Sequence, residues 1–265
     1  MALTLQSGQS GSQWEGAGHA IEGAWLELAG SVGGWVLVAV FALVTARALL
    51  RRGRYRAVEV LGEPELARLH EELVAAEKRT VGEVLPVVVE RSDRHPAAHW
   101  MAAATAVALG CVLLAGQLPW DRPLLFLGAQ LLLGAVGFGL SARLPDVQRL
   151  FISGRRARET AEEQAFQEFY RAGLHETKAR TGVLLFVSLL EHRVVVLADE
   201  GIAAKVDADH WKTTDAAVLD GIAAGSLRDG LIAGIRRAAS VLAEHFPWES
   251  EDENEVPDRI VVRRE

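Results

Sequence analysis

Four residues that could bind ions are predicted to meet, although they come from segments far apart in the sequence. Glu83 begins the apolar stretch EVLPVVVE, Arg180 precedes a second apolar run, and Asp199 and Glu200 follow a third. Carboxylate oxygens are the ligands that Ca²⁺ and Mg²⁺ prefer, and a guanidinium pairs with anionic groups. The residue types therefore predict a Ca²⁺ or Mg²⁺ site at Glu83, Asp199 and Glu200, with Arg180 as an anion or ion-pair partner. The alternative is structural: Asp199 caps a turn, and Arg180 pairs with Glu83 or Asp199.

Three apolar runs are the strands that must position these residues. Residues 183–189 and 194–198 are separated only by the polar link Leu190–Arg193, which predicts an antiparallel hairpin. Both runs are almost continuously hydrophobic, so we expect both faces of the hairpin to be covered. Residues 83–90 form another strand, in which Pro86 lacks an amide donor and so predicts an edge position or a bulge.

The direction of the strands decides which polar residues share an edge. The strand at 83–90 reaches the strand at 183–189 through a long crossover, which favours a parallel pair. Glu83 and Arg180 then lie at one end of the strands, and the hairpin brings Asp199 to the same end. At the opposite end of the strands we expect Ser92, Asp93, Glu191, His192 and Arg193 to lie close together.

The remaining histidines and serines give little indication of catalysis. His95 and His99 are four residues apart, but Pro96 interrupts them, which favours a loop or interfacial role over metal ligation. His192 falls in the hairpin turn and is expected to be exposed. Ser92 and Ser188 have no identifiable partner, so a serine hydrolase is not indicated.

Helical periodicity supplies the layers that cover the sheet. Apolar residues recur at helical spacing in four segments, namely 63–79, 155–175, 209–224 and 227–246. A short final strand is expected within 258–263. Strands that are apolar on both faces, together with these helices, predict an α/β fold with a short mixed sheet flanked by helices.

Three further runs have the length and apolarity of membrane spans. Residues 32–50, 100–118 and 123–142 each provide about 20 mostly apolar residues, enough to cross the hydrocarbon core. The last two form a hairpin in which Ala106, Gly110 and the glycines at 134, 137 and 139 would allow close helix packing. The arginine-rich flanks of the runs fall on one side, and the loop between the last two runs contains only one arginine, Arg122. These flanks contain Arg51, Arg52, Arg54, Arg56, Arg91, Arg94, Arg143, Arg149, Arg155, Arg156 and Arg158.

The positive-inside rule turns this pattern into a topology. The chain is expected in the inner (cytoplasmic) membrane, with its N-terminus outside and the α/β domain on the cytoplasmic side. The predicted organisation is a flexible segment at 1–31, a first span at 32–50, two parts of the α/β domain at 57–97 and 144–247, a transmembrane hairpin at 99–142, and an acidic tail with a possible strand at 248–265. The net charge of −7 argues against a nucleic-acid partner, and the single Cys111 allows no internal disulfide.

Several motifs resemble the TPM domain family. They are A-E-K-R-T-V-G-E-V at 76–84, R-S-D at 91–93, T-K-A-R-T-G-V-L-L-F-V-S at 177–188, A-D-E-G-I at 198–202, Trp211 and N-E-V-P-D at 254–258. The chain looks like the bacterial integral-membrane subgroup in which a transmembrane hairpin divides the domain, with an added N-terminal span. The resemblance implies a three-layer α/β fold and, in some members, acid phosphatase activity, calcium binding, photosystem repair or modulation of a membrane partner.

Two functions from different classes follow. The first is a membrane-anchored interaction or assembly module, whose partners are the lipid bilayer and another membrane protein. The alternative is a metal-dependent, acid phosphatase-like hydrolase that uses the carboxylates with Ca²⁺ or Mg²⁺. A transporter is a weaker third hypothesis, because the spans contain no Asp, Glu or Lys.

Overall fold

The computed structural model describes residues 43–50, 55–114, 123–248 and 255–263. The chain divides into two compact units, one made of residues 1–49 and 99–147 and the other of residues 50–98 and 148–265. The second unit is an α/β domain whose two sequence segments flank the helices of the first. The two segments of this unit therefore lie on either side of a helical insertion in the sequence.

A four-stranded mixed sheet forms the centre of the α/β unit. Its strands are β1 (Glu83–Val89), β2 (Gly182–Ser188), β3 (Arg193–Ala198) and β4 (Val261–Arg263), in the order β3-β2-β1-β4. β1 is parallel to β2 along its whole length, with Glu83 beside Gly182, and is also parallel to β4. β2 and β3 form the predicted antiparallel hairpin. The parallel pair and the final strand are confirmed as well.

The position of β1 corrects the expectation drawn from Pro86. β1 is a central strand and is buried throughout, not an edge strand. The amide of Glu83 donates to Thr181 on the β2 side, whereas that of Glu90 donates to the β4 side. Successive residues of a strand alternate in direction, so the nitrogen of Pro86 faces β4. The β4 ladder begins only at Val87, so the missing donor interrupts no pairing.

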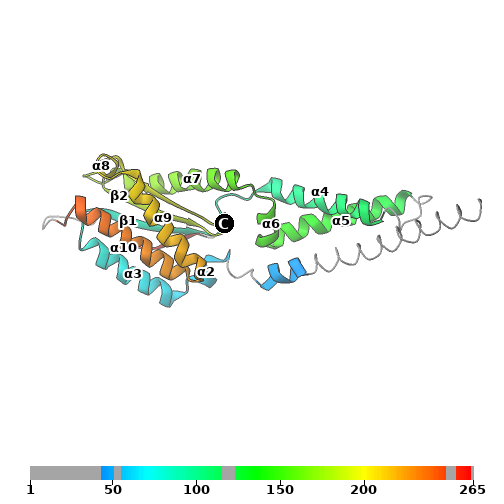
Figure 1. The fold of residues 1–265 in the computed structure, drawn as a ribbon, viewed down its shortest axis with the longest axis horizontal. Coiled ribbons are helices and arrows are strands. Elements are labelled where there is room, and N and C mark those ends of the chain that lie inside the picture. Colours follow the sequence, from blue (N-terminus) through cyan, green and yellow to red (C-terminus); the bar gives the residue numbers. More distant parts are fainter. Residues whose placement is uncertain (1–42, 51–54, 115–122, 249–254, 264–265) are drawn as a thin grey trace, which may run out of the picture. The chain divides into compact units, whose positions relative to one another are not determined.

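Helices cover both faces of the sheet and make three layers (Figure 1). On one face α3 (Glu63–Glu77), α9 (Ala208–Ala223) and α10 (Leu227–His245) enclose the larger core, which contains Leu73, Leu185 and Leu242. On the other face α7 (Gly154–Arg171) packs Ala161, Ala165 and Phe169 against Phe186. The four predicted helices are thus confirmed, with ends shifted by a few residues.

The strands of the hairpin differ in burial. β2 is buried at every position, as its apolar sequence predicts, but β3 is only half-buried at every position. β3 is the edge strand of the sheet, so helices cover its faces while one side of its backbone has no neighbouring strand among the described residues. The expected coverage of both faces is therefore present for β2 and β3, since α7 and α9 pack against β3, and its position at an edge leaves it half-buried.

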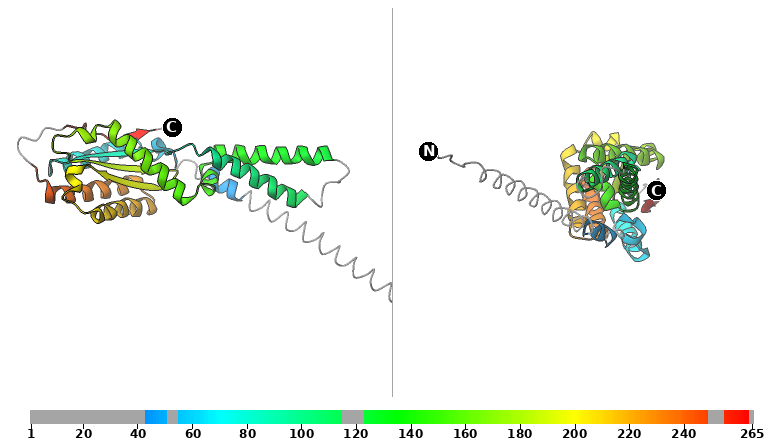
Figure 2. Two further views of the ribbon diagram at one scale, coloured as in Figure 1. Left: turned by 90° about the horizontal axis from the view of Figure 1, so that it is seen from above. Right: turned by 90° about the vertical axis from the view of Figure 1, so that its right-hand side faces the viewer.

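Short elements link the layers: α2 (Ala57–Val60), α6 (Pro145–Leu150), the 3₁₀ turn η2 (Leu174–Glu176) and α8 (Glu200–Ala203). Side-chain caps define two helix starts, because Ser153 accepts from the Arg156 amide at α7 and Ser226 accepts from the Asp229 amide at α10. After α7 the chain turns at Gly173, whose φ of 74° favours glycine. Figure 2 shows α7 on one side of the sheet when the molecule is turned.

The helical unit contains α4 (Pro96–Leu114) and α5 (Pro123–Arg143). Small residues allow the two helices to approach closely: a Cβ atom at Gly137 would lie 2.7 Å from Ala106 Cβ, and one at Gly134 would lie 3.2 Å from Val107. His99 Nδ1 lies 3.0 Å from Ser141 Oγ, which joins the helices by a polar contact. The two expected helices and the close approach at Gly110, Gly134 and Gly137 are confirmed, whereas a Cβ at Gly139 would meet only Arg143 of the same helix. α4 begins earlier than the predicted span, at Pro96.

One described helix is long and apolar enough to cross a membrane. α5 has a mean hydropathy of 1.9, and only 17% of its apolar stretch is buried within the protein. The apolar part of α4, Pro96–Val112, is shorter. The first predicted span lies mostly outside the described residues, of which 43–50 are helical.

Candidate functional site

The predicted ion site contains an ion pair and a helix cap. Asp199 Oδ1 accepts from the Glu200 amide at 2.8 Å and caps α8. The guanidinium of Arg180 lies 3.6 Å from Asp199 Oδ2. Glu200 is exposed. This geometry matches the structural alternative, in which Arg180 neutralises Asp199.

Glu83 lies at the same end of the sheet but on the other side of β2. It pairs with Gly182 across the β1–β2 ladder, whereas the Asp199 amide donates to Gly182 from the β3 side. The buried Glu83 carboxylate accepts from the Glu255 amide at 3.0 Å. Within the described segments no three His, Cys, Asp or Glu side chains form a group that could hold a metal ion. Metal binding at Glu83, Asp199 and Glu200 stays a prediction.

Glu77 interacts with two other carboxylates, those of Glu83 and Asp258. Burial, the side-chain hydrogen bond to Asp258, and the charges of Asp258 and Glu83 raise the pKa of Glu77 to about 9. Glu77 is the last residue of α3, and Asp258 lies shortly before β4. Neither residue was among the predicted site residues, although each falls within a motif that resembles the TPM family, 76–84 for Glu77 and 254–258 for Asp258. We call Glu77, Glu83 and Asp258 the acidic triad.

At the opposite end of the sheet a buried carboxylate organises a second polar group. Glu191 Oε1 lies 2.6 Å from His95 Nε2, and Ser188 Oγ donates to Glu191 Oε2. The Ser92 amide donates to both oxygens of this carboxylate at 3.1 Å. The Glu191 side chain is 0% exposed and that of His95 is 4% exposed. We call Ser92, His95, Ser188 and Glu191 the Glu191 cluster.

Hydrogen bonding keeps Glu191 ionised despite its burial. Burial alone would raise the pKa of Glu191, but the hydrogen bonds from His95, Ser188 and the Ser92 amide outweigh it, and the net effect lowers the pKa. Asp93 extends the cluster towards solvent, because its Oδ2 lies 3.7 Å from His95 Nδ1 and accepts from Arg156 at 3.3 Å. The end of β1, the β2–β3 turn and α7 are therefore linked through charged side chains.

The structure confirms part of the polar group predicted at this end of the sheet and corrects one expectation. Ser92, Asp93 and Glu191 do meet, and His192 is exposed and stacks on Tyr55 with ring centroids 5.7 Å apart. His95 lies in the loop before α4, as expected, and it is buried there with a φ of 47°. Ser188 was expected to lack a partner, yet it donates to Glu191. Only one feature of the sequence could have predicted that His95 and Ser188 meet: each lies at or just after the end of one of two adjacent strands.

In the Glu191 cluster, the surrounding hydrogen-bond donors stabilise the negative charge of the Glu191 carboxylate. In a nucleophilic site the serine hydroxyl donates to an imidazole, which then accepts the proton. Here Ser188 and His95 both contact the Glu191 carboxylate, and no hydrogen bond between Ser188 and His95 is found in the described part of the chain. The arrangement ties the turn of the hairpin to the segment that leads into α4.

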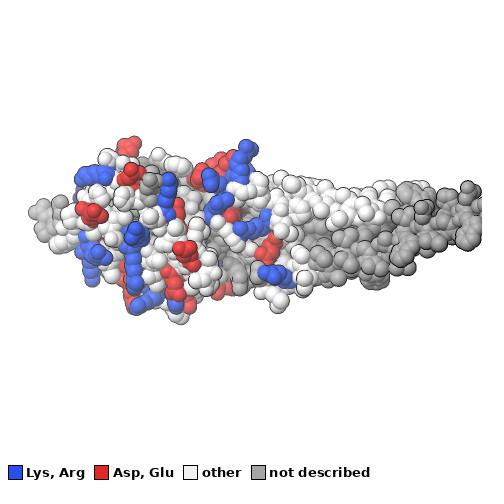
Figure 3. Space-filling model, in the orientation of Figure 1, with Lys and Arg blue, Asp and Glu red and all other residues white. Residues whose placement is uncertain are grey.

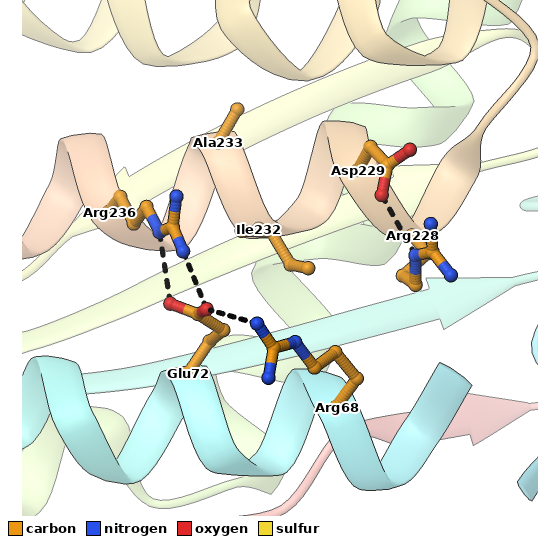
Figure 4. Close-up of a pocket in the computed structure, with 7 residues that line it drawn as sticks. All are labelled: Arg68, Glu72, Arg228, Asp229, Ile232, Ala233 and Arg236. Atoms are coloured by element: carbon orange, nitrogen blue, oxygen red, sulfur yellow. Dashed lines mark hydrogen bonds and ion pairs between the residues drawn. The ribbon is translucent and has the colours of Figure 1, made fainter. Parts of the chain in front are cut away.

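A groove of about 620 Å³ lies between α3 and α10 (Figure 4). Arg236 contacts both oxygens of Glu72, at 2.9 and 2.5 Å, and Arg68 lies 3.8 Å from the same carboxylate. Arg228 donates to Asp229 at 2.8 Å. The hydrogen bond from Arg236 lowers the pKa of Glu72. The guanidinium groups are thus already paired, and the groove is a charged helix–helix contact.

Figure 3 shows that most charged side chains on the drawn face belong to the α/β unit. The described helices of the other unit expose mainly apolar residues instead, among them Leu124, Leu127, Leu131 and Leu132. Each unit therefore has a surface of a different chemical kind.

Comparison with known proteins supports the fold. No protein-family model matches the chain, and a search of curated proteins found no match. The NMR structure of the BA42 protein from the psychrophilic bacterium Bizionia argentinensis is similar, with a TM-score of 0.50 and 21% sequence identity. The match covers 78% of this chain and 99% of that chain. At this identity the likeness concerns the fold alone.

Proposed function

We propose that the chain is a membrane-anchored α/β module, similar to the TPM domain, that acts by binding another membrane protein. The observation that carries this proposal is the position of the helical hairpin. β1 and β2 pair residue for residue, yet α4 and α5 separate them in the sequence. Folding of the sheet therefore fixes both ends of a hairpin that includes the membrane-length helix α5.

The surface of α5 supports its placement in lipid. Leu124, Leu125, Leu127, Leu131 and Leu132 are each more than half exposed. Contiguous apolar patches of this kind are rare on proteins surrounded by water and suit hydrocarbon. The arginine-rich flanks then favour the inner membrane, with the α/β unit on the cytoplasmic side and the N-terminus outside.

Binding is favoured over catalysis by the way the charged groups are arranged. The Glu191 cluster, the Arg180–Asp199 pair and the groove arginines are each neutralised by groups of the same chain. Such groups stabilise the fold and leave the outer surfaces to interact with a partner.

Membrane anchoring is tested by alkaline extraction. Wild-type protein expressed in bacterial cells should stay in the membrane pellet after a carbonate wash. The double substitution Leu131→Arg/Leu132→Arg should release most of it, because a charge at a span centre costs about 3 kcal/mol per residue. Leu219→Arg, at an exposed leucine of α9, is the matched control and should stay in the pellet. Release of the wild type by the wash would contradict the proposal.

Partner binding is tested by photo-crosslinking in intact membranes. A photoreactive residue at exposed Arg155 of α7 should give a discrete adduct with another membrane protein, whereas one at buried Ala161 should give none. Identical adduct patterns at both positions, or no adducts from any exposed helix position of the α/β unit, would argue against a binding module.

The resemblance to the TPM domain suggests a second candidate, a metal-dependent phosphatase-like hydrolase, although the described residues form no group of three ligands for a metal ion. Burial, together with the neighbouring Asp258 and Glu83 carboxylates, raises the pKa of Glu77 to about 9, and a divalent cation at Glu77 would favour its ionised form. Under this proposal millimolar Ca²⁺ or Mg²⁺ raises the melting temperature, since a bound ion stabilises only the folded state. The shift should vanish in Glu83→Gln and persist in Glu71→Gln. An unchanged melting temperature in both ions would remove this candidate.

A further inference from the structure

The edge strand β3 offers unpaired backbone groups to a partner. The Asp199 amide donates to Gly182, and hydrogen-bonding residues alternate along an antiparallel strand. The backbone amides and carbonyls of Arg193, Val195 and Leu197 therefore face β2. The amides and carbonyls of Val194, Val196 and Ala198 face the open side, where no described strand pairs with them.

β3 lacks the devices that usually protect a sheet edge. Between Val194 and Ala198 it carries no charge, no proline and no interruption of its pairing with β2. The other edge of the sheet is different. β4 has only three residues, and its Arg263 donates to Glu168 of α7 at 2.9 Å. The sheet thus has one protected edge and one edge suited to strand addition.

We propose that β3 pairs with β3 of a second copy of this chain, antiparallel and centred on Val196. In this register Val196 faces its own equivalent, and Val194 faces Ala198 of the second copy. These facing pairs would exchange about six backbone hydrogen bonds. The two sheets would join into one continuous sheet with a two-fold axis at Val196, which is a self-complementary interface.

Charge complementarity favours a second copy over an unrelated strand. The same register places Arg193 opposite Asp199 of the second copy, at both ends of the interface. Within one copy Arg193 donates to the Gly154 carbonyl at 3.1 Å, and its Nε has no hydrogen-bond partner among the described residues. Asp199 Oδ2 accepts no hydrogen bond from the described residues and lies 3.6 Å from Arg180, so Arg193 of the second copy would be an additional cation beside it. Residues facing each other at such positions have side chains close enough to pair. An unrelated partner strand would have to provide the opposite charges independently.

The helices that flank the edge carry exposed apolar side chains. α7 and α9 both pack against β3. Phe166 and Tyr170 of α7 are each more than half exposed, and Leu219 of α9 is also exposed. Joining two edges brings equivalent helices together, so these side chains gain a surface against which to be buried. The interface is independent of the membrane partner proposed above.

The test compares two substitutions at Val196 in the full chain solubilised in detergent. Val196→Pro removes an outward-facing amide without touching the β2–β3 ladder, and proline is tolerated at such edge positions. Val196→Thr keeps the branched shape and the amide. Wild type and Val196→Thr should sediment as dimers, and Val196→Pro should weaken dimerisation by at least about tenfold.

Disulfide crosslinking tests the same interface without placing a proline in β3. In a Cys111→Ser background, Val196→Cys should form a disulfide-linked dimer on mild oxidation, because facing residues of hydrogen-bonded pairs have Cα atoms about 5.5 Å apart. Asp220→Cys on α9 should not. A monomeric wild type, a dimer unaffected by Val196→Pro, or equal crosslinking at both cysteines would each overturn the proposal.

Discussion

At the residue scale, the Glu191 carboxylate shows how a buried charge becomes part of the fold. It is fully buried and accepts from His95, Ser188 and the Ser92 amide. A buried ion stabilises a structure only while its partners are present, and removing one partner leaves a charge without compensation. The Glu191 cluster should therefore respond strongly to substitution of its members.

His95→Ala should lower the free energy of unfolding by about 3 kcal/mol, because it leaves the Glu191 carboxylate with one partner fewer. Thermal unfolding in detergent measures the change. His192→Ala is the control, since His192 is exposed and also has a positive φ, and it should cost less than about 1 kcal/mol. Combining His95→Ala with Glu191→Gln should cost less than the sum of the single changes. Additive losses would contradict the coupling.

Glu77 should make stability fall with rising pH. Its carboxyl has a pKa of about 4.5 when unfolded and about 9 when folded. The stability it contributes is therefore complete below about pH 4.5 and is lost as pH rises through 9. Glu77→Gln should melt higher than wild type at pH 9 and should show a flatter dependence of melting temperature on pH.

The exposed Glu63 of the same helix provides the control for this experiment. Glu63→Gln should follow the wild-type dependence on pH. If Glu77→Gln and wild type kept a constant difference in melting temperature between pH 5 and 9, the raised pKa would be wrong.

At the element scale, the central strand β1 depends on residues that follow the helical insertion. Its Val87 and Val88 are fully buried, and its neighbours β2 and β4 both come from the second sequence segment. Neither segment can bury its apolar surface alone, so the two should fold as one cooperative unit.

A fragment of residues 154–265 should consequently be insoluble or loosely packed. It lacks β1 and α3, which exposes the fully buried β2 and part of α10. Joining residues 50–98 to 148–265 through a flexible linker should restore sharp amide dispersion and a cooperative thermal transition. A well-dispersed amide spectrum from the short fragment would show that the first segment is dispensable.

At the scale of the whole molecule, the arginine-rich flanks predict which parts of the chain lie on each side of the membrane. In a Cys111→Ser background, cysteines at Ser7 and Gln117 should react with an impermeant thiol reagent in intact cells. A cysteine at Lys212 of α9 should react only after lysis. Labelling of Lys212→Cys in intact cells, with protection of the other two, would reverse the topology.

The sequence by itself determined the local elements. Alternating or continuous apolar runs depend on neighbours within one segment, so the hairpin at 183–198, the strand at Glu83 and the four covering helices were predictable. The parallel pairing of β1 and β2 also followed, because a long crossover constrains strand direction. Strand direction decides which strand ends lie together, so the meeting of Ser92, Asp93 and Glu191 at one end, and of Arg180 and Asp199 at the other, was predictable.

Only the tertiary structure decided the details that depend on pairing across long sequence distances. Pro86 lies in a central strand because β4, from the end of the chain, begins one residue beyond its missing donor. His95 and Ser188 become buried partners because Glu191 is folded between them, and Glu77 approaches Asp258 from 181 positions away in the sequence. Burial and electrostatic neutralisation are properties of the assembled core, and a single segment of sequence does not contain them.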